Sequence, residues 1–235
     1  MLKISRLCTA LMLGLSSAAM AQATATDTTV AIGPDGTPRY DVGTFDVAGI
    51  QLGMTSDQVR AAMQEKWFSV AETAVPRHLT YAGLVQARAT RLNQPGPDVA
   101  SVAGPAEMSG TDTGRNRLVV RFVQTREGPR VSTVRLTFNR NTNDFDRLEA
   151  DLADRYGRPS RKMFASHGSH WCGVGGIATC DVSPDRGAPK LSYSPSIAAT
   201  LTLTNFEAMT AARDAEIAAL FDAPTGERQR SLLGS

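Results

Sequence analysis

The stretch RLVVRFVQTREGPRVSTVRLTFNR, residues 117–140, decides the fold class of this chain. Leu118, Val120 and Phe122 alternate with other residues, and such alternation predicts a β-strand with one buried face. A second alternating run occupies residues 131–140, and Gly and Pro stand between the two runs. The stretch therefore predicts an antiparallel hairpin.

Helix signals precede and follow this hairpin. Thr55 and Gln58 form a capping box, which starts a helix. Asn143 is an N-cap candidate for a second helix that ends at Gly157, and a final helix is expected after Asn205. The buried stripe of the final helix is expected to comprise Phe206, Met209, Ile217, Leu220 and Phe221. Other strands are expected at 162–165, around the cysteines, at 191–194 and at 199–204.

The order helix, strands, helix, strands, helix predicts an α+β protein whose helices pack on an antiparallel sheet. The two expected arrangements are tandem helix-plus-sheet halves, residues 44–140 and 141–222, or one domain. Residues 78–89 are expected to form a third strand of the first half, with Leu79 and Tyr81 pointing inward.

Three segments are poor in large apolar residues and are expected to pack loosely. Residues 22–43 are expected to be a flexible tether, and residues 223–235 a loose tail. Residues 93–116 are rich in Gly, Pro, Ser and Asp, so we expect a long loop that is either functional or disordered.

The first 21 residues have the organisation of a secretory signal peptide. Lys3 and Arg6 precede an apolar run from Leu7 to Leu15, and small residues lead to Ala21. This order is typical of signal peptides, and the run is shorter than the roughly 20 residues that span a membrane. We expect cleavage after Ala21 and export into a bacterial periplasm, with no transmembrane segment.

Charge argues against a nucleic-acid partner. The whole chain has 25 Lys and Arg and 23 Asp and Glu. Lys3 and Arg6 belong to the signal peptide, which has no acidic residue, so residues 22–235 contain 23 basic and 23 acidic side chains. A chain without net positive charge lacks the broad basic field that nucleic-acid binding requires.

Cys172 and Cys180 are the two cysteines of residues 22–235. In an oxidising compartment, two cysteines favour a disulfide, and their spacing differs from the two-residue gap of thioredoxin-type redox pairs. Gly175 and Gly176 suit a turn between them. We expect a hairpin whose three-residue loop, centred on Gly176, places Cys172 opposite Cys180.

His167, His170 and Asp181 surround these cysteines and form the candidate metal site of the sequence. Imidazole and carboxylate are common zinc ligands. The alternative is a polar, solvated turn that leads into the hairpin. Residues 173–178 match a G-x-G-x-x-A pattern, but no helix is expected after them, so they predict no nucleotide site. We assign no resident metal and no cofactor.

Residues 49–59, GIQLGMTSDQV, resemble the G-M-T-x-x-x-V helix start of small outer-membrane lipoproteins of the SmpA/OmlA (BamE) family. A similar helix-then-sheet unit occurs, sometimes in tandem, in β-lactamase inhibitor proteins. The resemblance implies a periplasmic binding fold without catalysis. Gln22 stands where a lipoprotein carries its cysteine, so we expect no lipid anchor.

The sequence contains no G-x-S-x-G elbow, H-E-x-x-H helix, S-x-x-K dyad or phosphate loop. We assign no catalytic residue. We expect a non-catalytic binding or envelope-assembly module with an envelope-protein partner, acting through a sheet face or through residues 93–116. The alternative function is a small metal-binding protein or metal-dependent enzyme that uses His167, His170 and Asp181.

Overall fold

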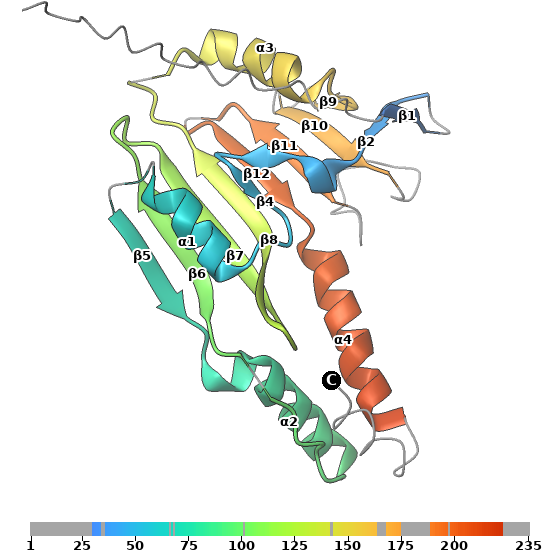
Figure 1. Ribbon diagram of the computed structural model, residues 1–235. Coiled ribbons are helices and arrows are strands. Elements are labelled where there is room, and N and C mark those ends of the chain that lie inside the picture. Colours follow the sequence, from blue (N-terminus) through green and yellow to red (C-terminus); the bar gives the residue numbers. More distant parts are fainter. Residues whose placement is uncertain are drawn as a thin grey trace, which may run out of the picture.

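A computed structural model describes residues 30–33, 36–65, 67, 69–100, 102–141, 143–163, 168–174, 189–196 and 198–222. Within these residues the chain is an α+β protein with a 10-stranded, mostly antiparallel sheet (Figure 1). Its strands are β1 (Val30–Ile32), β2 (Pro38–Tyr40), β5 (Ser69–Ala74), β6 (Pro105–Thr111), β7 (Arg117–Thr125), β8 (Gly128–Thr137), β9 (Arg161–Met163), β10 (Gly168–Gly173), β11 (Lys190–Ser194) and β12 (Thr200–Thr204). The order across the sheet is β1-β2-β10-β11-β12-β8-β7-β6-β5, and β9 pairs with β10.

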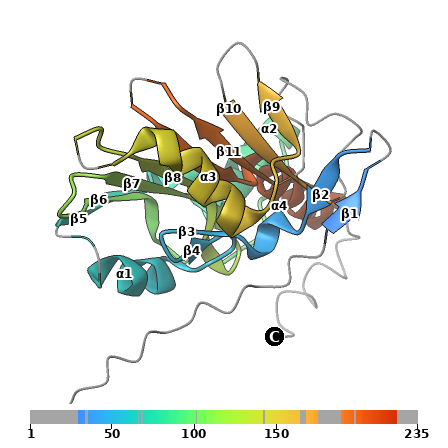
Figure 2. The same ribbon diagram turned by 90° about the horizontal axis from the view of Figure 1, so that it is seen from above.

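The remaining elements are helices and one short hairpin. The α-helices are α1 (Ser56–Gln64), α2 (Tyr81–Leu92), α3 (Phe145–Tyr156) and α4 (Phe206–Asp222); the 3-10 helices are η1 (Val42–Thr44) and η2 (Arg77–Leu79); the hairpin is β3 (Asp46–Val47) and β4 (Ile50–Gln51). α1, α3 and β3–β4 lie on the same side of the sheet (Figure 2). α2 and α4 contact each other beyond one end of β7 and β8 (Figure 1). In the described part of the chain, no helix is long and apolar enough to cross a membrane.

The predicted capping box starts α1. The Thr55 hydroxyl accepts from the Gln58 backbone N–H at 3.3 Å, and the Gln58 side chain accepts from the Thr55 backbone N–H at 2.9 Å. These bonds satisfy two backbone donors that a helix start otherwise leaves unpaired. Val59 and Met63, one turn apart, are both fully buried, so α1 packs this stripe against the sheet.

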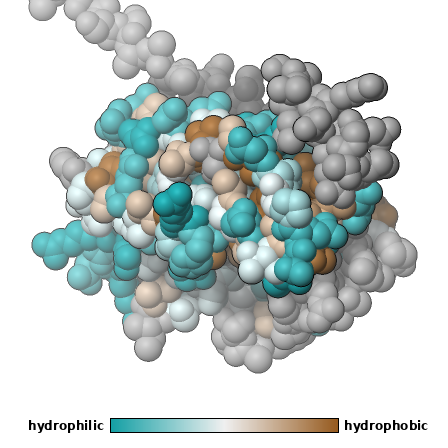
Figure 3. Space-filling model, turned by 90° about the horizontal axis from the view of Figure 1, so that it is seen from below, coloured by the Kyte–Doolittle hydropathy of each residue, from teal (hydrophilic) through white to brown (hydrophobic). Residues whose placement is uncertain are grey.

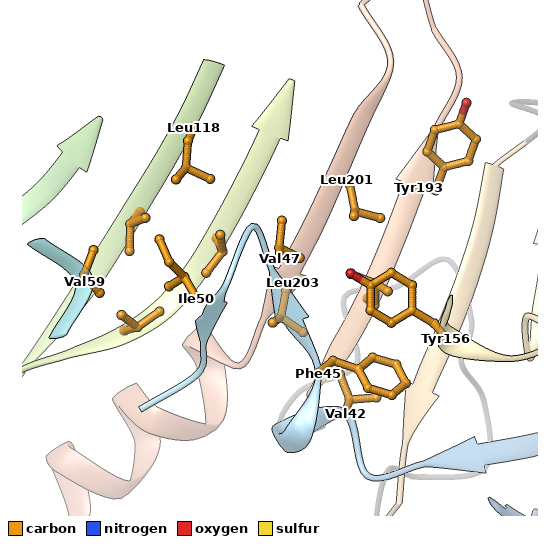
Figure 4. Close-up of a cluster of buried hydrophobic side chains, with 14 of the residues drawn as sticks. Val42, Phe45, Val47, Ile50, Val59, Leu118, Tyr156, Tyr193, Leu201 and Leu203 are labelled. Carbon is orange, nitrogen blue, oxygen red and sulfur yellow. The ribbon is translucent and has the colours of Figure 1, made fainter. Parts of the chain in front are cut away.

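The main core fills the space between the sheet and the elements on this side of it (Figure 4). Val59 of α1 and Ile50 of β4 face Leu118 of β7, while Phe45 and Tyr156 pack together with ring centroids 5.0 Å apart. Burial of such side chains is the main favourable term in folding.

The predicted hairpin is confirmed and joins the two expected halves. β7 pairs with β8 around a tight turn that ends at Gly128, whose φ is +114°. β8 also pairs with β12, so that Val134 lies opposite Leu203 and Leu136 opposite Leu201. The strands expected at 191–194 and 199–204 are present as β11 and β12. A continuous sheet therefore runs through residues from both expected halves.

The strand expected at residues 78–89 is wrong, because this segment forms η2 and then α2. Thr80 caps α2 by accepting a hydrogen bond from Gly83 N–H at 3.1 Å. Tyr81, Val85 and Ala89 are all buried and recur every four residues, which is helical spacing. They pack against Ile217 and Phe221 of α4 in a second, smaller core.

Two segments expected to be loose contribute to the sheet. The tether expected over 22–43 includes β2 and η1, and Tyr40 and Val42 are buried in the main core. The loop expected over 93–116 includes β6, whose Met108 is fully buried. Small residues make β6 inconspicuous in the sequence. A Cβ on Gly110 would lie 2.9 Å from the Met63 methyl group, so a small residue fits this position.

α3 and α4 occupy the predicted regions, with differences at their starts. α3 begins at Phe145, and the Asn143 side chain donates to Asn116 and to the Asn139 carbonyl. Gly157 ends α3 with φ +83°, as expected. Phe206, expected in the buried stripe of α4, is 50% exposed, because the helix packs mainly through its C-terminal half.

Candidate binding surface

Side chains on the side of the sheet away from α1 and α3 are almost entirely polar. Leu118 and Val120 of β7 enter the main core, so the residues between and beside them point to the opposite side. The same alternation operates in β8, β12, β11 and β6. We call this surface the polar sheet face; its residues are Glu107, Ser109, Thr111, Arg117, Val119, Arg121, Thr133, Arg135, Thr137, Lys190, Ser192, Ser194, Thr200, Thr202 and Thr204.

Strand register arranges these residues in rows that cross the sheet. The first row contains Thr111, Arg117, Thr137, Thr200 and Ser194. The second contains Ser109, Val119, Arg135, Thr202 and Ser192. The third contains Glu107, Arg121, Thr133, Thr204 and Lys190. Each row therefore holds an arginine among hydroxyl groups.

The polar sheet face is positively charged although residues 22–235 are neutral as a whole. Arg117, Arg121, Arg135 and Lys190 oppose a single acid, Glu107. Glu107 accepts from Arg121 Nε at 3.0 Å, in a partly exposed ion pair. Among the described residues, no ion pair is formed by Arg117 or Arg135, and both side chains are exposed. The surplus of cations favours an anionic partner.

A hollow of about 210 Å³ lies within this surface. Arg117, Arg121 and Arg135 line it together with Glu107 and Val119, and Thr133 and Thr137 complete the lining. Thr133 and Thr204 place their hydroxyl oxygens 3.0 Å apart. The hollow thus combines three guanidinium groups with hydroxyl groups, which can donate hydrogen bonds to an anion.

His170 lies on β10 beside this surface and is half-buried. Its Nδ1 is 2.9 Å from the Ser192 hydroxyl and its Nε2 is 2.8 Å from the Met163 sulfur. Burial, and then the positive charges of Lys190 and Arg161, lower the pKa of His170. A nearby pair of cations also disfavours a bound metal ion.

The Ser192–His170 contact also falls short of a hydrolytic triad. In such a triad a carboxylate orients the imidazole that activates the serine. Here the Met163 thioether takes the position of that carboxylate. The contact therefore gives no support to nucleophilic catalysis.

His167, Cys180 and Asp181 lie outside the described residues, and His170 is the one predicted metal ligand that the structure describes. Within the described ranges, no group of three or more His, Cys, Asp or Glu side chains could hold a metal ion.

The strand around Cys172 differs from the expected hairpin. Cys172 lies opposite Lys190 of β11 on one edge of β10 and opposite Arg39 of β2 on the other. Both ladder positions beside Cys172 are therefore occupied, and the register that places Cys180 there is wrong. Cys172 is buried and is not a free thiol. Its pairing with Cys180 remains a prediction.

A wider hollow of about 560 Å³ lies at the start of α2. Arg77, His78 and Asp98 line it, and all three are exposed. Figure 3 shows the end of the molecule near α2 and α4, where small hydrophobic areas are separated by hydrophilic ones. Neither feature points to a class of ligand, whereas the cationic side chains of the polar sheet face favour an anionic one.

No protein-family model, curated protein or solved structure matches this chain. The resemblance of residues 49–59 to the SmpA/OmlA (BamE) family remains a prediction. The sequence signal that could have found the polar sheet face is the alternation of β7 and β8, which places Arg117, Arg121 and Arg135 on the side opposite the apolar residues.

Proposed function

We propose that this protein is an exported, non-catalytic binding module of the bacterial envelope that acts through the polar sheet face. The observation that carries the proposal is the alignment of Arg117, Arg121 and Arg135 with hydroxyl groups on one exposed side of the sheet. Charged and hydroxyl side chains in fixed positions on a rigid sheet suit recognition of a partner.

The proposal includes the location and covalent state of the protein. Residues 1–21 act as a signal peptide that is removed after Ala21, and residues 22–235 work in the periplasm, with Cys172 bonded to Cys180. The composition of residues 1–21 supports export, and the sulfur of Cys172, which is not a free thiol, supports the bond. Intact-mass measurement tests both statements, since cleavage makes Gln22 the first residue and the bond lowers the mass by about 2 Da, two hydrogens.

Site-specific crosslinking in intact cells tests the binding function. A photoreactive amino acid replaces Val119, at the centre of the polar sheet face, and in a matched control it replaces Ala61, exposed on α1. We expect a reproducible crosslink to an envelope protein from position 119 that is absent from position 61. Equal crosslinking from both positions, or none from position 119, contradicts the proposal.

A further inference from the structure

The arginines of the polar sheet face occupy successive rows. Arg117 lies opposite Thr137, Arg135 opposite Val119 and Arg121 opposite Thr133. Successive rows are two residues apart, and a strand rises about 3.4 Å per residue, so the rows repeat at about 6.8 Å. The backbone positions of the three arginines therefore follow the direction of β7 and β8 at a regular interval.

An extended peptide has the same repeat, because its side chains point to one side at every second residue. We propose that the polar sheet face binds an acidic segment of a partner protein in an extended conformation, with carboxylates at alternate residues. This inference rests on the proposed function and names the chemistry of the partner.

Carboxylates suit these arginines for geometric and electrostatic reasons. The planar guanidinium group donates two parallel hydrogen bonds to a carboxylate, which adds direction to charge attraction. Among the described residues, no ion pair occupies Arg117 or Arg135. Thr137 and Thr202 lie opposite them on the neighbouring strands, so a residue with a hydroxyl group flanks each arginine on the same side of the sheet.

Other anionic partners fit this surface less well. The hollow of about 210 Å³ is smaller than the sites of roughly 300–1,000 Å³ that enclose small molecules. Surfaces that enter a membrane combine basic residues with Trp, Phe or Leu. Here the outward apolar side chain among the arginines is Val119, and hydroxyl groups occupy most other positions.

Glu107 limits how much negative charge the third row can accept. Its carboxylate lies 3.0 Å from Arg121 Nε and competes with a carboxylate of the partner for the same guanidinium. Glu107→Gln removes this competitor and should strengthen binding. Loss of an arginine should weaken binding, and so should any general disturbance of the sheet. A gain in affinity from Glu107→Gln therefore identifies competition for Arg121.

Fluorescence anisotropy with a labelled peptide of alternating Glu and Thr tests the inference on purified residues 22–235. Arg117→Gln and Arg135→Gln should each weaken binding about tenfold, because each removes a bidentate contact. The matched control is Arg91→Gln, which removes the same charge from an exposed position on α2 and should change affinity about twofold or less. Circular dichroism checks that each variant remains folded.

Two control peptides test charge and spacing. A peptide with Gln in place of Glu should not bind, and one with the same residues but its Glu grouped together should bind more weakly. The inference is overturned if the grouped peptide binds as tightly as the alternating one, or if the alternating peptide does not bind. It is also overturned if Arg91→Gln loses as much affinity as Arg117→Gln and Arg135→Gln. Vesicles rich in phosphatidylglycerol, or an oligonucleotide, that bind more tightly than the alternating peptide overturn it as well. A crosslink from position 119 together with no peptide binding leaves the proposed function standing and refutes only the acidic partner.

Discussion

Trp171 links α3 to the sheet, and its replacement tests how the main core is held together. The side chain is fully buried on β10, and its Nε1 donates to the carbonyl oxygen of Gly157 at 2.7 Å. Gly157 is the residue that ends α3, and the Trp171 ring also meets Tyr156 edge-on at a centroid distance of 6.1 Å. We predict that Trp171→Phe destabilises the protein by about 3–5 kcal/mol.

The magnitude has two parts. Leaving the half-buried Gly157 carbonyl without its donor costs about 1–3 kcal/mol. Phe also lacks three ring atoms of Trp, and at about 0.8 kcal/mol for each buried carbon the lost burial adds roughly 2 kcal/mol. Urea denaturation followed by far-UV circular dichroism measures the sum, because this signal does not depend on the tryptophan that is removed.

Trp67→Phe is the matched control. Trp67 is also buried, but its Nε1 has no acceptor among the described residues. The same atoms are lost without breaking a hydrogen bond, so this variant should cost about 2 kcal/mol or less. If Trp171→Phe costs no more than Trp67→Phe, the bond to Gly157 does not stabilise the fold as argued.

Three further substitutions test other parts of the structure. Thr55→Ala should lower the free energy of unfolding by about 1 kcal/mol because it removes half of the capping box, whereas Thr55→Ser should retain most of it. Gly110→Ala should cost about 1–3 kcal/mol, because the added Cβ would lie 2.9 Å from both the Met63 methyl group and the Ser69 carbonyl oxygen; an unchanged urea midpoint contradicts this tight packing. Folding lowers the pKa of His170, so as the pH falls the unfolded state binds a proton at a higher pH than the folded state does. The free energy of unfolding should therefore decrease as the pH drops below about 6.5. His170→Gln should remove this part of the pH dependence, and an unchanged slope of urea midpoint against pH shows that the residue does not contribute.

Local signals were enough to predict the elements that contain them. The capping box at Thr55 and Gln58 involves residues three apart, and it starts a helix in any context that does not oppose it. The alternation in β7 and β8 is equally local, since strand and turn follow one another without interruption. The α+β class and the helix-plus-strand order follow from these elements.

The sequence pattern does not identify α2, because its segment carries two periodicities. Leu79 and Tyr81 are two residues apart, as in a strand, while Tyr81, Val85 and Ala89 are spaced as in a helix. The Thr80 cap and contact with α4, more than 120 residues later, decide in favour of the helix. The contact with α4 is tertiary, so periodicity within the segment could not reveal it.

Rare residues close together in the sequence predict the metal-site candidate, whereas the structure builds the polar sheet face from common residues far apart. Arg135 and Thr202 become neighbours only because β8 pairs with β12. That pairing is fixed by the core, because a shift of one residue would move Leu201 and Leu203 from the core to the polar side. The apolar side of β12 therefore determines which hydroxyl groups stand beside the arginines, and the binding surface is a consequence of the same register that buries the core.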